Sequence, residues 1–266
     1  MSAINTNINS LNAQRNLAGT ALSLSTSMQR LSSGLRVNSA KDDAAGLAIA
    51  ERMNAQTRGM NVAIRNANDA ISLAATAEGA LGAISNNLQR MRELAVQGAN
   101  GTNGAADIGA LDKEYALLVA ENTRVIAATK FNGQALLSAA TAFDFQVGAD
   151  TGDKITVTAV IAVQTATTLG ATNALANAQI AVIDTDIAQI NGVRATWGAT
   201  QNRFEGVISN LRVSSENTAA ARGRIMDADY AMETANLSRA QVLQQAGTAM
   251  VAQANQGPQG VLALLR

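Results

Sequence analysis

The stretch IAVIDTDIAQINGVRATWGATQNRFEGVISNL, residues 180–211, carries an apolar side chain at every seventh position. This series consists of Ile183, Ile190, Trp197, Phe204 and Leu211. Apolar residues repeated every seven positions are typical of a helix that packs lengthwise against another helix, so we interpret the series as the seam of a bundle. A second series in the stretch contains the polar residues Arg194 and Gln201, and polar seam residues fix the register of helices at some cost in stability.

Around this stretch, apolar residues at steps of three, four and seven predict further helices. The expected helices cover about residues 4–35, 43–99, 107–129 and 225–256, and the seam helix is expected to begin near Asn173. The helix over residues 43–99 is much longer than the ~11–12 residues of an ordinary globular helix, which indicates a coiled coil or an assembly. Gly257-Pro258 is expected to end the last helix, because proline lacks the N–H of the helical hydrogen bond.

Two short runs in the middle of the chain alternate apolar and polar residues, as strands do. Their apolar members are Phe143, Phe145 and Val147 in the first run, and Ile155, Val157 and Ala159 in the second. The turn sequence GADTGD, residues 148–153, separates the runs and predicts a β-hairpin. A single hairpin is marginal in water, so we expect it to pack on the helices. Asn132-Gly133 marks a further turn.

The predicted fold class is therefore mainly α: an elongated, coiled-coil-like helical bundle with a small β-hairpin and terminal helices that pair with each other. Helices with narrow apolar stripes are marginal alone, so we expect many copies to pack together through the terminal pair. The expected segments are residues 1–42 with the first helix and its connection, 43–137 with the next two helices, 138–173 with the hairpin and a loop, 174–224 with the seam helix, and 225–266 with the last helix.

Composition excludes several classes of function. The 266 residues include no cysteine, no histidine and one proline. Disulfide scaffolds and cysteine metal sites are impossible, and most metal and triad chemistries lack their usual histidine. The 20 basic residues balance 20 acidic residues, which argues against nucleic-acid binding, since that function needs a basic surface. No apolar run is long enough for a membrane span, and no signal peptide is expected.

Candidate catalytic groups are few, and we expect neither an enzyme, a cofactor nor a metal site. Asp42-Asp43 and the pair Asp227 and Asp229 stand at expected helix starts, where carboxylates complement the helix dipole. The glycine-rich GANGTNG, residues 98–104, follows a helix rather than a strand, which does not fit a phosphate-binding loop. Residues 89–97 and 201–204 combine arginine with amides, a composition found both in recognition surfaces and on solvated faces.

Several long motifs resemble bacterial flagellins, in a short form without the variable outer domains. They are LSSGLRVNSAKDDAAGLAIAERM (31–53), RNAND (65–69), NNLQRMRELAVQ (86–97), FNG (131–133), SRAQVLQQAGTAMVAQANQ (238–256) and VLALLR (261–266). The motifs follow one another in the family's order, and the resemblance covers about residues 1–137 and 174–266. Only residues 138–173 stand where larger flagellins carry outer domains.

The resemblance implies a structural subunit that self-assembles into the helical filament of the bacterial flagellum for swimming. The terminal helices would form the inner tube and the longer helices with the hairpin the outer tube. It also implies secretion by the flagellar type III export apparatus, an extracellular location, and hook-associated and cap proteins as partners. A cytoplasmic export chaperone would hold a C-terminal core-tube segment that includes Val242, Ala249, Leu262, Leu264 and Leu265.

The resemblance further implies recognition by a host Toll-like receptor, through a surface that also makes subunit contacts. The matching positions are Gln89, Arg90, Leu94 and Glu114, with their neighbours Arg92 and Glu93. Three alternatives remain at this point: a hook-associated junction protein of the same apparatus, an amphipathic protein of membrane surfaces, and an enzyme with two carboxylates. The Asn-, Ser- and Gln-rich faces of the terminal helices disfavour the membrane alternative, which needs basic polar faces.

Overall fold

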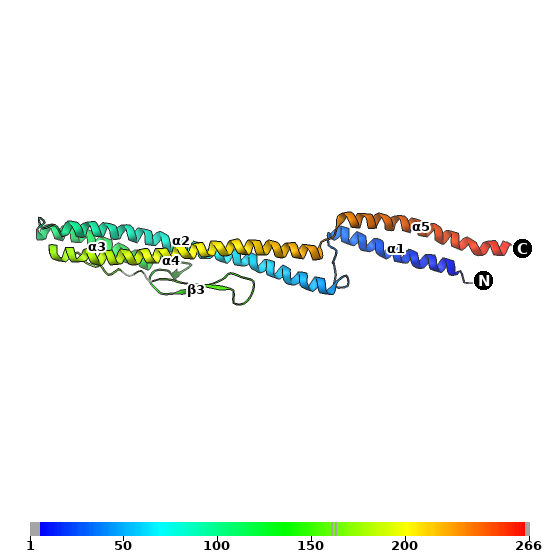
Figure 1. Ribbon diagram of the computed structural model, residues 1–266, viewed down its shortest axis with the longest axis horizontal. Coiled ribbons are helices and arrows are strands. Elements are labelled where there is room, and N and C mark those ends of the chain that lie inside the picture. The colour runs from blue at the N-terminus through cyan, green and yellow to red at the C-terminus, as the bar shows by residue number, and fades with distance from the viewer. Residues whose placement is uncertain (1–5, 161, 163, 264–266) are drawn as a thin grey trace. The chain divides into compact units, whose positions relative to one another are not determined.

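The computed structural model describes residues 6–160, 162 and 164–263, with side chains described as far as Gln256 (Figure 1). The helices are α1 Ile8–Ser33, α2 Ala44–Gly98, α3 Ala105–Ala128, α4 Asn173–Met226 and α5 Tyr230–Ala263. The strands are β1 Lys130–Phe131, β2 Gln134–Ala135, β3 Ala142–Gln146 and β4 Lys154–Thr158. The protein is therefore mainly α with a small hairpin, as the sequence predicts. No helix in the described part of the chain is both long and apolar enough to cross a membrane.

The chain forms two compact units. The terminal unit, residues 1–55 and 217–266, contains α1, α5, the start of α2 and the end of α4. The bundle unit, residues 56–216, contains the rest of α2 and α4 together with α3 and the strands. The boundaries lie within α2 and α4, so neither long helix belongs to one unit alone.

Heptad residues of α4 fill the core of the bundle unit. Ile183, Ile190, Trp197 and Phe204 are buried, whereas Leu211, the last of the series, is half-buried. The four buried residues pack in one core with apolar residues of α2, including Leu81, Ile84, Leu88 and Met91. The polar seam residue Arg194 lies at the edge of this core, where its Nε and Nη2 donate to one oxygen of Glu78 on α2 at 2.9 and 2.8 Å.

The hairpin of β3 and β4 packs on this core. Ile155 and Val157 are buried, and the ring of Phe145 meets Phe204 edge-on at 5.6 Å between centroids. The side-chain amide of Asn66 on α2 donates to the Gln146 carbonyl at 2.9 Å. A Cβ on Gly59 of α2 would lie 2.8 Å from the Cβ of Ala149 in the turn, so the turn approaches α2 at a position that only glycine accommodates.

The segment between β4 and α4 has no regular structure but is partly buried. Ala162, Ala166 and Leu169 lie in the core. The buried carboxylate of Asp186 on α4 accepts hydrogen bonds from the Thr165 hydroxyl and from the Thr165 and Ala166 N–H groups, the latter two at 2.9 and 3.0 Å. This carboxylate holds the segment on the bundle, an arrangement that the sequence did not predict.

A second, smaller core joins the two long helices to the connection after α1. Val37, Ala50 and Met226 are its buried members. Leu35 and Asp227 form an isolated β-bridge, and the Ala228 N–H donates to the Gly34 carbonyl at 2.9 Å. α1 therefore ends, and α5 begins, at one hydrogen-bonded joint.

Two expected helix limits are wrong. α4 continues past Arg222-Gly223-Arg224 to Met226, and α5 continues through Gly257-Pro258 to Ala263. Proline removes one helical hydrogen bond, but its fixed φ of about −65° is itself helical, so helix can continue on both sides of it. The positions of Leu264 and Leu265 lie outside the described residues, as does the side chain of Leu262.

Candidate assembly and recognition surfaces

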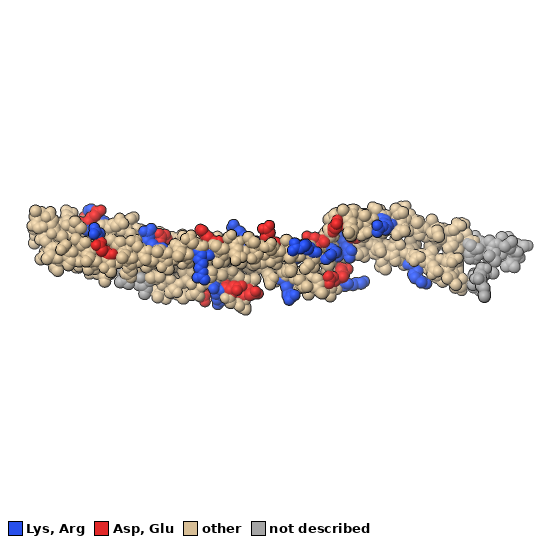
Figure 2. All heavy atoms as spheres, in the orientation of Figure 1, with Lys and Arg blue, Asp and Glu red and all other residues tan. Residues whose placement is uncertain are grey.

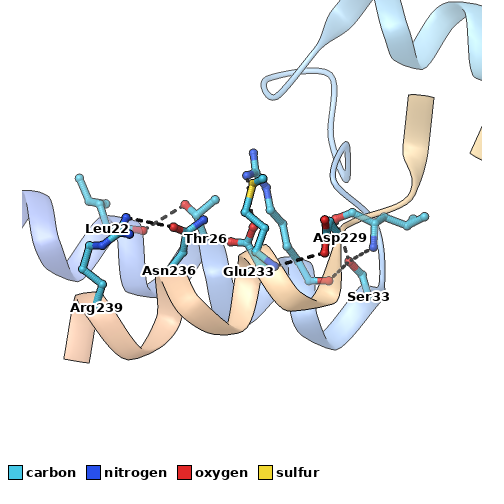
Figure 3. Close-up of polar contacts among 10 residues, drawn as sticks. Leu22, Thr26, Ser33, Asp229, Glu233, Asn236 and Arg239 are labelled. Carbon is cyan, nitrogen blue, oxygen red and sulfur yellow. Dashed lines mark hydrogen bonds and ion pairs between the residues drawn. The ribbon is translucent and has the colours of Figure 1, made fainter. Parts of the chain in front are cut away.

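α1 and α5 lie side by side, and we call them the arm pair (Figure 1). At the joint end, the Tyr230 hydroxyl donates to the Leu31 carbonyl at 2.8 Å, and Arg30 approaches Glu233 to 3.9 Å. Figure 3 shows Thr26 and Ser33 of α1 with Glu233, Asn236 and Arg239 of α5, and Arg239 donates to Asn236 on the same helix at 3.3 Å. The joint end of the pair is therefore held by polar contacts.

The far end of the arm pair is also held by polar contacts. The amide of Asn7 donates to the Ala254 carbonyl at 2.7 Å. The hydroxyl of Ser10, which is buried, donates to the side-chain oxygen of Asn255 at 2.7 Å. We call these four residues the tip clasp.

Between its two ends the arm pair exposes much apolar surface. The large apolar residues that it exposes are Ile8, Leu11, Leu22, Met28, Tyr230, Met232, Val242, Leu243 and Met250. Ala249 is exposed as well. A groove of about 670 Å³ runs between the helices, lined in part by Leu17, Leu243 and Met250. The face in Figure 2 shows few charges on this pair, and exposed apolar surface of this extent marks a contact site for other molecules.

A second surface lies on the bundle unit, where arginines of α2 join three helices. Arg90 donates to Glu114 of α3 at 2.8 Å and to Glu93 at 2.9 Å. Arg92 donates to both carboxylate oxygens of Asp184 on α4, at 2.6 and 3.4 Å. Gln89 lies beside them and is exposed. We call this set of exposed side chains the arginine face.

The hydrogen bonds shift the acidities of these groups. The hydrogen bond to Glu114 raises the pKa of Arg90 most, and the hydrogen bond to Glu93 raises it further. The hydrogen bond to Asp184 raises the pKa of Arg92. The hydrogen bond from Arg92 in turn lowers the pKa of Asp184. Asp184 was not among the predicted site residues. Its place on the same face follows from the packing of α4 on α2, which no local motif encodes.

The expectation that the predicted recognition residues share one exposed face is wrong for Leu94. Its side chain has no exposed surface and packs in the bundle core. Leu94 lies four positions after Arg90 on α2, and together with Met91 and Ala95 it belongs to the buried apolar stripe of that helix. Leu94 therefore supports the arginine face from beneath.

Of the carboxylates considered as catalytic groups, Asp43 and Asp229 cap helix starts, whereas Asp42 bonds to the turn before α2. Asp42 accepts from the Ser39 and Asn38 N–H groups at 2.9 and 3.1 Å, which lower its pKa, and Asp43 accepts from the Gly46 N–H at 2.8 Å. Asp229 accepts from the first N–H groups of α5. Within the described residues, no group of three or more acidic side chains is arranged to hold a metal ion.

A helical bundle with a terminal helix pair that exposes its apolar side chains defines a structural protein that packs against other chains. Family models describe the same organisation: the bacterial flagellin N-terminal helical region matches residues 4–142, and the C-terminal helical region matches residues 180–265. The chain belongs to the flagellin family. It is a structural subunit of the bacterial flagellar filament, and the family consists of structural proteins that assemble with themselves.

Relatives match over nearly their full length. A flagellin of Halalkalibacterium halodurans is 46% identical over 270 residues, covering 99% of both chains. The flagellar filament 33 kDa core protein of Treponema phagedenis is 40% identical over 286 residues, again covering 99% of both. The crystal structure of Bacillus cereus flagellin is 40% identical and superposes with a TM-score of 0.52, covering 59% of this chain and 94% of that one.

Proposed function

We propose that the arm pair is the surface through which subunits pack in the core of the filament. In this arrangement residues 1–42 and 225–266 form an inner tube, and residues 43–137, 138–173 and 174–224 form an outer tube. The observation that carries the proposal is the row of exposed apolar side chains on α1 and α5.

Physical reasons support this role for the arm pair. A helix pair that buries little apolar surface is marginal alone, and each apolar side chain that a neighbouring copy covers contributes roughly 25 cal/mol per Å². The helices carry four charged residues in all, Arg15, Arg30, Glu233 and Arg239, so packing of copies desolvates few charges. Contacts between unlike surfaces of identical copies build open helical arrays when the rotation between copies does not close a ring.

The proposal is tested by placing one charge on the arm pair. Leu243, which is 51% exposed, is replaced by glutamate, and Leu175 on the bundle unit, which is 53% exposed, receives the same change as a matched control. We expect Leu243→Glu to abolish filaments in sedimentation and negative-stain microscopy, because its carboxylate would be buried between copies. Leu175→Glu should assemble. Normal filaments of the Leu243→Glu protein would exclude the arm pair as the packing surface.

We further propose that the arginine face is recognised by a host Toll-like receptor. The intact QRMRELAVQ sequence and the exposure of Gln89, Arg90, Arg92, Glu93 and Glu114 support this role. Arg90→Ala should weaken receptor activation by purified monomer, because exposed arginine at an interface centre often dominates binding. Arg124→Ala, which removes an exposed arginine paired with Glu121 on the same unit, is the control. Equal activation by both variants would remove the arginine face from recognition.

The proposal also includes secretion through a type III export apparatus and a chaperone that covers α5 before export. The exposed Val242 and Ala249 support a chaperone site on this helix, since exposed apolar surface requires cover in the cytoplasm. Hook-associated and cap proteins would meet the ends of the filament. We expect Val242→Glu to lose chaperone binding in a pull-down, whereas the arginine-face variant Arg90→Ala keeps it.

A further inference from the structure

The interior of the arm pair provides little free energy for pairing. Among the described side chains of α1 and α5, those buried most are Ser10, Ser27, Glu233 and Ala240, all small or polar. On α5, small residues recur every seven positions at Ala240, Gly247 and Ala254. Grooves of about 670 and 890 Å³ remain open between the helices. Apolar burial therefore contributes little to holding α1 against α5.

The two ends of the pair are unequal. The joint end is fixed by the β-bridge of Leu35 with Asp227 and by the short connection between α4 and α5. The opposite end has no such covalent restraint, so the arms would separate from the tip toward the joint. Among the described residues at that end, the hydrogen bonds of the tip clasp oppose separation.

Asn7 links the formation of α1 to the pairing. Its side-chain oxygen accepts from the Ser10 N–H at 3.1 Å and caps α1, while its amide nitrogen donates to the Ala254 carbonyl of α5 at 2.7 Å. The Asn7 side chain thus accepts from a backbone N–H at the start of α1 and also forms a hydrogen bond across the pair. Ser10, one turn further along α1, adds a part-buried hydrogen bond to Asn255.

We infer that the tip clasp is a positioning element for assembly: Asn7 and Ser10 hold α1 closed on α5 in the geometry on which a neighbouring copy packs. This inference rests on the proposed packing role of the arm pair. A single hydrogen bond shifts an equilibrium by roughly five- to tenfold, so loss of the Ser10–Asn255 bond moves a marginal pair measurably toward separated arms.

A disulfide reports the closed pair. The chain has no cysteine, and a Cβ built on Gly247 lies 3.8 Å from the Cβ of Leu17, the mean separation in disulfides. Leu17→Cys with Gly247→Cys should therefore cross-link when the arms are closed. The short contact between Gly247 and the Leu17 Cδ1 disappears in this variant, because Leu17 itself is replaced.

The test combines this reporter with loss of the clasp. In the Ser10→Ala/Asn255→Ala background we expect oxidation to slow on the order of tenfold and filament yield to fall, and prior oxidation should restore the yield. Ser25→Ala/Gln245→Ala, at exposed positions of the same helices, is the matched control. Asn255→Asp keeps the oxygen that accepts from Ser10, so its disulfide should form at the same rate as in the chain with an intact clasp.

Three outcomes decide the matter. Unchanged oxidation and unchanged yield in the clasp variant would overturn the inference, and so would a yield that oxidation fails to restore. A loss shared by the control variant would also overturn it, since any weakened helix would then suffice. The packing proposal is tested separately by Leu243→Glu, which leaves the tip clasp intact.

Discussion

Among the described residues, Trp197 has the largest fully buried side chain. It lies at the centre of the α4 heptad series. Its indole nitrogen has no hydrogen-bond partner among the described residues, so its contribution is apolar packing. We expect Trp197→Ala to destabilise the bundle unit by about 3–5 kcal/mol in urea unfolding, since a large cavity would remain. Leu211→Ala, at the half-buried end of the series, should cost less. Equal midpoints for Trp197→Ala and the parent chain would remove Trp197 from the core.

Asp186 is the residue on which the segment before α4 depends. Both of its carboxylate oxygens accept hydrogen bonds from Thr165 and Ala166. An asparagine in its place has only one oxygen, and its NH2 group would face backbone N–H groups that need an acceptor. Asp186→Asn should cost about 1–3 kcal/mol and speed amide exchange at Thr165 and Ala166. Asp184→Asn, on the exposed side of α4, is the control. Unchanged exchange at Thr165 would show that other contacts hold the segment.

The pair of Arg92 and Asp184 predicts a pH dependence. Because the pKa of Asp184 is lower in the folded protein than in the unfolded chain, the pair stabilises the fold above the usual pKa of an aspartate and loses this effect as the pH falls through the lowered value. A carbon-detected NMR titration should therefore give Asp184 a midpoint below the usual roughly 3.9, and Arg92→Gln should raise it. The same midpoint in both proteins would contradict the pair in solution.

The structure also contains residues whose burial or partners could not be predicted from the sequence. The resemblance located Arg90 and Glu114 but not the burial of Leu94, because a motif gives positions along a helix and not which side faces the core. Asp184 and Asp186 were missed for a related reason. Their partners lie 92 and 20–21 positions away, and no short-range pattern connects such pairs.

At the scale of elements, periodicity predicted the helices and the hairpin because each requires a repeating apolar face. It did not predict that α5 passes Pro258, since a local penalty of about 3 kcal/mol can be outweighed by the rest of the helix. Nor did it predict the burial of Ala162, Ala166 and Leu169 between β4 and α4, which follow neither the helical nor the strand period. Regular elements are thus readable from sequence, whereas irregular segments depend on tertiary hydrogen bonds.

Alignment of α2 against α4 depends in part on Arg194 and Glu78. Both side chains are about a third exposed, so solvent screens their attraction. Arg194→Leu alone should cost about 1 kcal/mol and leave Glu78 unpaired, whereas Arg194→Leu/Glu78→Leu should recover most of the loss. Thermal unfolding of the single and double variants measures this coupling. Additive losses in the double variant would mean that the two helices align without the pair.

At the scale of the whole molecule, the absence of net charge and the two compact units allow dense packing of copies without strong mutual repulsion. The bundle unit has a large apolar core, whereas the arm pair buries mostly small or polar side chains. We therefore expect free subunits to gain helical circular dichroism when they polymerise, because the arms become fully helical only when other copies cover them. An unchanged spectrum in a sample that microscopy shows to be filamentous would contradict this expectation.

Truncation of α5 distinguishes the role of the arm pair from that of the bundle unit. A chain that ends at Asn236 loses most of α5, and with it the tip clasp and the exposed residues Val242, Leu243 and Met250. The bundle core involves residues only as far as Ile208, so its cooperative unfolding by heat should persist with little change in midpoint. The same protein should form no filaments under any salt that polymerises the full chain, because α1 would then lack the helix it pairs with. Ordinary filaments of the truncated chain would show that copies pack through the bundle unit instead, and would end the assignment of assembly to the arm pair.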